Sequence, residues 1–211
     1  MKTIPFFFLI AASLSCFAQN KEPKNELGLN LYGIEIDVDF LGDGQSQNYY
    51  ANGLQYKRDL NLHYKLRLSG QYFTREESGS MTYEPIGPST TWNYITTTFE
   101  VRSGAERSFW ASSKIRPFVF ADLVYRKSKD KGTSQSSPAD FGGGGTYDID
   151  RTTEYGGVIG GLGVKYSPIP SIYFGLETSI GKYWQVFSGQ QSPYSITLFS
   201  PVKTLVFGIS F

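Results

Sequence analysis

The segment LHYKLRLSGQYFT, residues 62–74, decides the fold class of this chain. Apolar and charged side chains alternate along it, with Leu66 and Leu68 on one face and Lys65 and Arg67 on the other. A strand sends successive side chains to opposite faces, whereas a helix repeats about every 3.6 residues. The segment therefore predicts a β-strand with one apolar and one charged face.

The same alternation recurs along most of the chain, and no segment has a convincing helical period. The alternation changes phase near Gly33, which predicts a β-bulge there. Together with residues 62–74, the alternating segments predict eight strands, at residues 26–40, 50–58, 95–105, 115–126, 158–166, 172–181 and 204–211.

The predicted connections alternate between short and long, which places all tight turns at one end of a closed sheet and all long loops at the other. The short ones are residues 58–61, 106–114 and 167–171, and the long ones are 42–49, 75–92, 127–150 and 186–202. The long ones are rich in Gly, Ser, Thr, Gln and Pro, a composition typical of solvated loops. Binding residues are often carried on such loops, so Met81, Tyr83, Ile86, Trp92, Phe141 and Tyr147 are candidate contact residues.

Composition excludes several classes of protein. Of 211 residues, 40% are hydrophobic and 16% aromatic, and such abundance argues against disorder. The mean hydropathy of −0.27 argues against a bundle of membrane-spanning helices. A single Cys and a single His exclude a disulfide framework and leave little for a His-based metal site or triad. We expect no metal and no cofactor.

The first 18 residues, MKTIPFFFLIAASLSCFA, have the charged start, apolar centre and small-residue ending of a secretory signal peptide. Cleavage after Ala18 would remove Cys16, whose alternative role is a lipidated N-terminus. The expected organisation is a signal peptide (1–18), a polar stub (19–25) and one β-domain (26–211). The mature chain would carry about zero net charge, which gives no reason to expect a nucleic-acid partner.

Alternation alone does not say whether the apolar row faces a core or lipid. Most apolar rows span roughly the 9–11 residues that a tilted transmembrane strand needs. The polar face is rich in glycine, as a narrow interior requires, at Gly104, Gly161, Gly163, Gly175, Gly181 and Gly208. These features favour a transmembrane barrel over a soluble periplasmic binding barrel, which stays the alternative fold.

The chain ends in KTLVFGISF, residues 203–211, with Leu205, Phe207, Ile209 and Phe211 alternating up to the last residue. This ending resembles the C-terminal insertion signal of Gram-negative outer-membrane barrels. With the leader and eight strands, the chain resembles the small OmpA/OmpX-like outer-membrane proteins. The resemblance implies an all-β, eight-stranded antiparallel up-and-down transmembrane barrel in the outer membrane. It also implies contact with lipid and lipopolysaccharide and recognition by the barrel-insertion machinery; we further expect a monomer.

In that fold the apolar row ends in two belts of aromatic residues at the lipid headgroups. The turn-side belt is expected to hold Tyr64, Tyr166 and Phe211, and the loop-side belt Tyr50, Tyr72, Tyr125 and Trp184.

The polar row would then face the interior, where charges must be paired. Arg67, Glu100, Arg102 and Asp122 are expected at similar heights on neighbouring strands. A structural ion-pair network is the favoured interpretation, and a gated polar pathway is the alternative. The predicted interior charges are Lys65, Arg67, Glu100, Arg102, Asp122, Arg126, Lys165 and Glu177.

Two other patterns suggest chemistry only weakly. His63 could serve an acyl-transfer site, but the chain offers no second His and His63 falls at the turn end, so no catalytic residue is predicted. Residues 142–145, four glycines, lack the Lys-Ser/Thr of a phosphate loop. The acids Asp140, Asp148, Asp150 and Glu154 match no calcium loop and are expected to be a solvated cluster.

The sequence therefore predicts a non-enzymatic outer-membrane barrel whose loops mediate surface contact or membrane integrity. The alternatives are a narrow channel for small solutes or ions, a lipid-modifying enzyme and a soluble periplasmic binding barrel.

Overall fold

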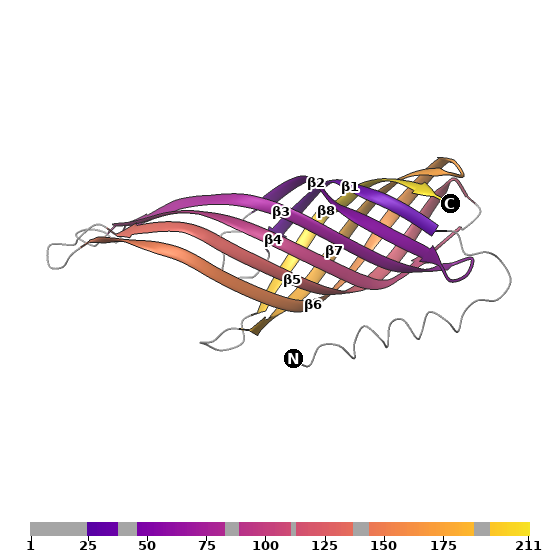
Figure 1. Ribbon diagram of the computed structural model, residues 1–211. Coiled ribbons are helices and arrows are strands. Elements are labelled where there is room, and N and C mark those ends of the chain that lie inside the picture. Colours follow the sequence, from indigo (N-terminus) through magenta and orange to yellow (C-terminus); the bar gives the residue numbers. More distant parts are fainter. Residues whose placement is uncertain (1–24, 38–45, 83–88, 111–112, 137–143, 188–194) are drawn as a thin grey trace.

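The computed structural model describes residues 25–37, 46–82, 89–110, 113–136, 144–187 and 195–211, and these form eight strands (Figure 1). The expected signal peptide and most of the stub lie outside the described residues. The strands are β1 (Asn25–Asp37), β2 (Ser46–Asp59), β3 (Tyr64–Thr82), β4 (Ser89–Ser108), β5 (Ile115–Ser136), β6 (Gly145–Ile169), β7 (Ile172–Phe187) and β8 (Ser195–Ser210).

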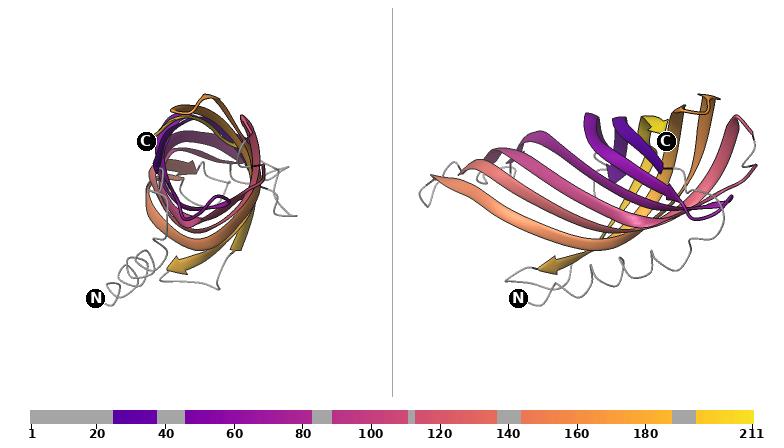
Figure 2. Two further views of the ribbon diagram at one scale, coloured as in Figure 1. Left: turned by 90° about the vertical axis from the view of Figure 1, so that its right-hand side faces the viewer. Right: turned by 45° about the vertical axis from the view of Figure 1, so that its right-hand side comes forward.

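Each strand pairs antiparallel with the next one in the chain, and β1 pairs with β8 to close the ring. Figure 2 shows the closed ring in the view along the barrel. Closure leaves no open edge where all eight strands take part, so the backbone groups there bond to neighbouring strands. The predicted eight-stranded up-and-down barrel is confirmed. Among the described residues no helix is long and apolar enough to cross a membrane.

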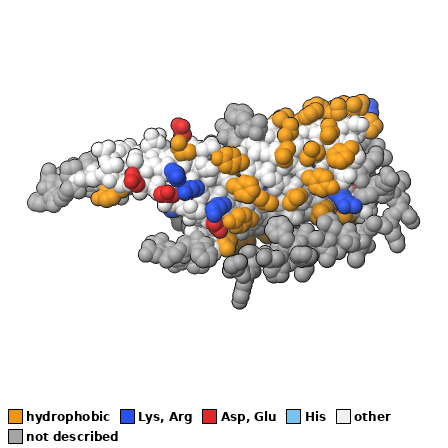
Figure 3. All heavy atoms as spheres, viewed as in Figure 1, with side chains coloured by type: hydrophobic (Ala, Val, Ile, Leu, Met, Phe, Trp, Pro, Cys, Tyr) orange, Lys and Arg blue, Asp and Glu red, His pale blue; other side chains and the backbone are white. Residues whose placement is uncertain are grey.

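The apolar row of the strands points outward. In β5, Leu123 is 54% exposed, whereas the next residue, Val124, is 5% exposed. Hydrophobic side chains gather on the face of the closed barrel seen in Figure 3. The expected belt residues Tyr64, Tyr166 and Phe211 are exposed at the turn end, and Tyr72, Tyr125 and Trp184 on the loop side; the side chain of Tyr50 lies outside the description.

The interior is packed by aromatic rings laid against glycines of the neighbouring strand. Phe118 lies opposite Gly163 and Phe120 opposite Gly161. A Cβ atom at Gly163 would come within 2.2 Å of the Phe118 ring, and one at Gly161 within 2.5 Å of the Phe120 ring. Glycine is therefore required at these positions because the ring occupies the space of a side chain.

The predicted bulge near Gly33 takes the form of a longer irregularity in β1. Toward β2 the register shifts once, between Asn30 and Tyr32. Toward β8 it shifts three times between Asn30 and Ile36, a stretch that includes Gly33. The shifts change the phase of β1, so that Glu26 and Glu35 both point into the barrel although they are an odd number of residues apart.

The expectation of long loops at residues 75–92 and 127–150 is wrong, because most of these residues belong to strands. β3 and β4 stay paired to Thr82↔Ser89, and β5 and β6 to Ser136↔Gly145. Likewise β2 begins at Ser46 and β8 at Ser195, inside the two other expected loops. Ladder hydrogen bonds need no apolar row, and Thr is favoured in strands, so a polar stretch continues the hairpins.

Four strands consequently project beyond the closed barrel, at the left of Figure 1. We call this part the extension and define it as residues 74–82 of β3, 89–97 of β4, 129–136 of β5 and 145–152 of β6. Within the described pairings, β3 meets β2 only up to Gln71 and β6 meets β7 only up to Glu154. The extension is therefore an open sheet attached to a closed one.

Candidate functional site

The charged interior is the most unusual chemical feature of the barrel. All eight side chains expected there are buried, each 6% exposed or less. Among the described residues the buried charges form a balanced set of seven acids and seven bases. They are Glu26, Glu35, Glu100, Glu106, Asp122, Asp130 and Glu177, with Lys57, Lys65, Arg67, Arg102, Arg126, Lys165 and Lys203.

Nearest the turn end, Glu26 of β1 binds two lysines from across the barrel. Its Oε1 lies 2.6 Å from the Lys65 Nζ and also accepts a hydrogen bond from Lys165. Lys65 in turn lies 2.5 Å from the Asp59 Oδ1. One carboxylate thereby joins β1, β3 and β6, which are not neighbours in the ring.

The central cluster is built around Arg67 of β3. Its guanidinium lies 2.8 Å from Glu177, 3.2 Å from Glu106 and 3.4 Å from Asp122. Lys57 donates to Glu106 at 2.5 Å and lies 3.4 Å from Glu177. The guanidinium also lies over an aromatic ring of the interior, 4.0 Å from the centroid of Phe120, a favourable cation–π geometry.

The loop-side cluster is built around Glu100, which is 0% exposed. Glu100 accepts hydrogen bonds from Arg102 and, at 2.6 Å, from Arg126. Arg126 also donates to both carboxylate oxygens of Glu35 at 2.8 Å, and Lys203 donates to Glu35 at 3.0 Å. β1, β4, β5 and β8 are thus tied together at this level.

The expectation that Arg67 and Glu100 lie at one height is wrong. Arg67 and Asp122 share a rung with Gly104, whereas Glu100 shares a rung with Gln71 and Arg126. The sequence placed these residues on the correct face, but pairing register decides which of them meet. The result is separate clusters along the barrel rather than one belt.

Six buried charges were missed by sequence reasoning: Glu26, Glu35, Lys57, Glu106, Asp130 and Lys203. Glu35 lies between Ile34 and Ile36 and could have been found by the same alternation. Lys203 was missed because it adjoins a stretch expected to be a loop. Asp130 was missed for the same reason, since the loop expected at 127–150 is strand.

The remaining candidates lie outside this interior. His63 is exposed in the turn before β3, with its Nδ1 3.3 Å from the Ser108 carbonyl oxygen. On the outer surface, Glu154 pairs with Lys127 at 2.7 Å and Asp150 with Lys129 at 3.3 Å. Asp148 is exposed on β6. No group of three or more His, Cys, Asp or Glu among the described residues could hold a metal ion.

The candidate contact residues are only partly described. Trp92 lies in β4 and Tyr147, 60% exposed, lies in β6, both within the extension rather than in loops. Met81 belongs to β3, but its side chain lies outside the description, as do Tyr83, Ile86, Phe141, Asp140 and residues 142–143.

Two cavities lie at opposite ends of this interior. The turn-end cavity, of about 330 Å³, is lined by Glu26, Asp59, Arg116 and the 167–170 turn. The loop-end cavity, of about 250 Å³, lies where the extension leaves the barrel and is lined by Tyr94, Tyr155, Arg75 and Arg151. Between them stand the ion-paired clusters and the rings of Phe118 and Phe120, so the interior is filled by side chains.

An apolar exterior around a charged, packed interior reverses the arrangement of a water-soluble barrel. A closed sheet with such an exterior satisfies its backbone internally and suits hydrocarbon as its surroundings. Fold and interior together define a small eight-stranded β-barrel of the outer-membrane type.

Comparison with solved structures finds several similar proteins. Outer membrane protein W of Escherichia coli is 16% identical, with a TM-score of 0.48, and the match covers 92% of this chain and 100% of that one. Neisserial surface protein A is 13% identical, with a TM-score of 0.45, over 90% and 96%. The attachment invasion locus protein of Yersinia pestis is 12% identical, with a TM-score of 0.44, over 90% and 100%. No protein-family model and no curated protein matches the chain.

Proposed function

We propose that the protein is a non-enzymatic outer-membrane anchor that holds the extension outside the cell for contact with surfaces or for membrane integrity. The observation that carries this proposal is the difference between the two parts of β3–β6. Within the closed barrel their outward side chains form an apolar row, whereas in the extension the outward side chains are mostly polar and the inner face carries Trp92, Tyr94 and Tyr147 among polar residues. In the view of Figure 3, hydrophobic side chains gather on the barrel and are sparse on the extension. A rigid sheet held clear of the bilayer suits recognition, because it fixes the geometry of the residues it presents.

The filled interior supports an anchor rather than a channel. An eight-stranded barrel has an interior just wide enough for side chains, and here the interior is occupied by paired charges. Conduction would require those pairs to separate within a low-dielectric wall, which is costly. We therefore expect no reproducible conductance from the purified protein in planar bilayers; regular single-channel steps that Glu100→Gln alters would favour the channel alternative.

The proposal includes partners that follow from an outer-membrane position. Lipid would surround the apolar exterior, and lipopolysaccharide would surround its loop side. The alternating end Leu205, Phe207, Ile209 and Phe211 would serve as the signal for the insertion machinery after export through the leader. We expect the monomer to be the working unit.

The orientation is tested by labelling single cysteines on intact cells. Thr133→Cys lies in the extension and Ser171→Cys in the turn between β6 and β7, and both side chains are exposed. A membrane-impermeant maleimide should label Thr133→Cys on intact cells and Ser171→Cys only after permeabilisation. The unmodified protein, whose only Cys is in the leader, is the control. The reverse labelling would overturn the proposed orientation, and recovery of the protein in the soluble periplasm would overturn the anchor.

A further inference from the structure

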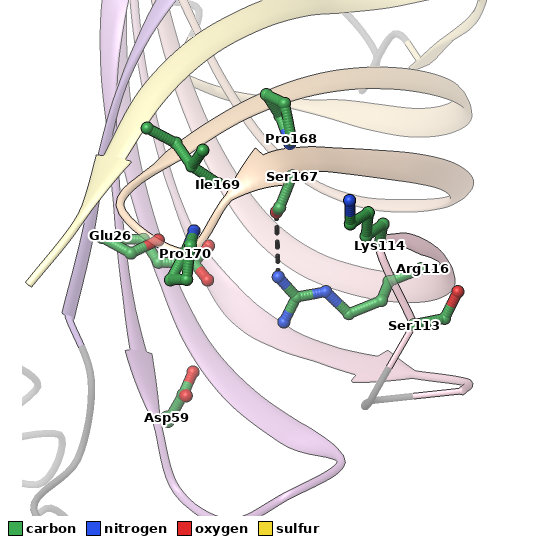
Figure 4. A pocket seen from close by; sticks show the side chains of 10 residues that line it. Glu26, Asp59, Ser113, Lys114, Arg116, Ser167, Pro168, Ile169 and Pro170 are labelled. Carbon is green, nitrogen blue, oxygen red and sulfur yellow. Dashed lines mark hydrogen bonds between the residues drawn. The ribbon is translucent and has the colours of Figure 1, made fainter.

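The turn-end cavity is lined by two basic side chains that form no ion pair with the described acidic residues of the barrel. Lys114 and Arg116, at the start of β5, line one side of it, and Glu26 and Asp59, from β1 and β2, line the other (Figure 4). Ser113 and Ser167 stand beside the two bases.

The acids on the far side are already neutralised. Glu26 binds Lys65 and Lys165, and Asp59 binds Lys65, through contacts inside the barrel. Lys114 and Arg116 have no acidic partner within 4.0 Å among the described residues. Counting the two neutralising lysines, the cavity has a formal excess of two positive charges.

The hydrogen-bond donors at the positive side are held in place by the fold. Arg116 donates to the Ser167 Oγ at 2.9 Å, the contact drawn in Figure 4, and its buried Nε has no hydrogen-bond partner in the part of the chain that the structure describes. The Ser113 Oγ accepts a bond from the Ile115 amide at 3.2 Å. Both hydroxyl groups accept these bonds and so keep their own protons available to donate. The Lys114 carbonyl oxygen accepts from the Ser167 amide at 2.8 Å, which joins the two segments.

The opposite side offers an acceptor instead. The Glu26 Oε2 is buried and has no hydrogen-bond partner among the described residues. A ligand that suits both sides therefore carries an oxyanion at one end and a hydrogen-bond donor at the other. Several donors around two cations suit a phosphate, which has more acceptor oxygens than a carboxylate.

From this cavity we propose that the turn end is a binding site for a phosphate ester with a hydroxyl- or amine-bearing substituent. The phosphate lies between Lys114, Arg116 and the Ser113 and Ser167 hydroxyls, and the substituent faces Glu26. Pro168, Ile169 and Pro170 form an apolar rim, and Ile169 is 51% exposed. Such an ester has two sources, a free metabolite or the headgroup of a lipid in the leaflet at the turn end. The lipid source rests on the membrane position proposed above.

The test uses the full mature chain refolded in maltoside micelles, which contain no phosphate. Binding of sn-glycerol 3-phosphate and of dihexanoyl phosphatidylglycerol, below its micelle concentration, is followed by ³¹P NMR. The variants are Lys114→Gln with Arg116→Gln, and separately Ser167→Ala. The matched control is Arg107→Gln, an exposed cation near the same end that stacks on Tyr64 and does not line the cavity.

We expect the double variant to weaken binding at least tenfold and Ser167→Ala to weaken it less, with Arg107→Gln unchanged. Comparable affinity for both probes supports a free phosphate ester, and binding of the lipid alone supports a headgroup. The proposed site would be overturned if a millimolar concentration of either probe caused no change in the ³¹P spectrum. It would also be overturned if Arg107→Gln weakened binding as much as the double variant. Ser167→Ala keeps the test decisive if the double variant fails to refold. Failure here leaves the cysteine-labelling result unaffected, so the two proposals are separable.

Discussion

Residues 115–126 of β5 belong to the closed barrel, and residues 129–136 of the same strand belong to the extension. In the first part every second side chain is buried from Phe118 to Arg126. In the extension Asp130 is the one buried side chain among those described. Backbone pairing continues through both parts, so both have the same ladder of hydrogen bonds. They differ in how many of their side chains are buried.

The comparison shows what holds each part together. The barrel combines a filled interior with ring closure. The extension relies on its ladder, on polar contacts such as Arg151 to Asp130 at 2.7 Å and Thr96 to Asp130 at 2.9 Å, and on the ring of Trp92 laid over Gly79. An open sheet with little apolar burial gains little from the hydrophobic effect. Its order therefore depends on the barrel beneath it.

The largest effect is expected from removing an interior carboxylate. Glu100→Ala would leave Arg102 and Arg126 buried with a lost partner, which costs about 3–5 kcal/mol in unfolding free energy. Asp150→Ala removes an exposed acid from the extension and should change that free energy by less than about 0.5 kcal/mol. Urea unfolding in micelles measures both. Equal midpoints would remove the distinction between the two parts.

A smaller effect is expected from filling the space of an interior glycine. In Gly163→Ala the new methyl group meets the Phe118 ring, and overpacking of this kind costs about 1–3 kcal/mol. Gly160→Ala, on the outer face of the same strand, has its nearest neighbour at 3.9 Å and should be nearly neutral. The same unfolding assay applies, and a greater loss from Gly160→Ala would contradict the assigned faces.

Shortening the extension should affect the barrel little. Lys129 and Thr152 lie opposite each other, so an Asn-Gly turn can replace residues 130–151 while the register below is kept. We expect the unfolding free energy to change by less than about 1 kcal/mol, since little apolar surface is lost. The shift in electrophoretic mobility between boiled and unboiled samples should persist. Its loss would show that the extension is needed for barrel closure.

The smallest effect is expected at the Lys127–Glu154 pair, outside the apolar band. The hydrogen bond from Lys127 lowers the pKa of the Glu154 carboxyl below its usual value of 4.5. A lowered folded-state pKa contributes stability above the unfolded pKa, and that contribution is lost as the pH falls through the folded value. Because the pair is solvated, Lys127→Ala should leave the midpoint at neutral pH unchanged within error. NMR titration of Glu154 should show its pKa rising in the variant; an unchanged pKa would contradict the contact.

The sequence was sufficient for the fold because alternation reports side-chain direction, as at Leu123 and Val124. It also identified much of the interior, since a charged residue between two apolar ones must lie on the opposite face. It did not reveal that the strands continue past the apolar band, because residues 127–136 have no apolar row to mark them. Nor did it show that Arg67 meets Glu177, 110 positions away, since ring closure and register set such contacts.

The central claim is that the outer face of β3–β6 contacts lipid within the closed barrel and contacts water in the extension. Nitroxide labels at Leu123→Cys and Thr133→Cys, ten residues apart on the outer face of β5, test it directly in lipid bilayers. We expect the label at 123 to collide mainly with oxygen and the label at 133 mainly with a water-soluble nickel complex. Strong nickel contact at 123, or lipid-like behaviour at 133, would contradict it.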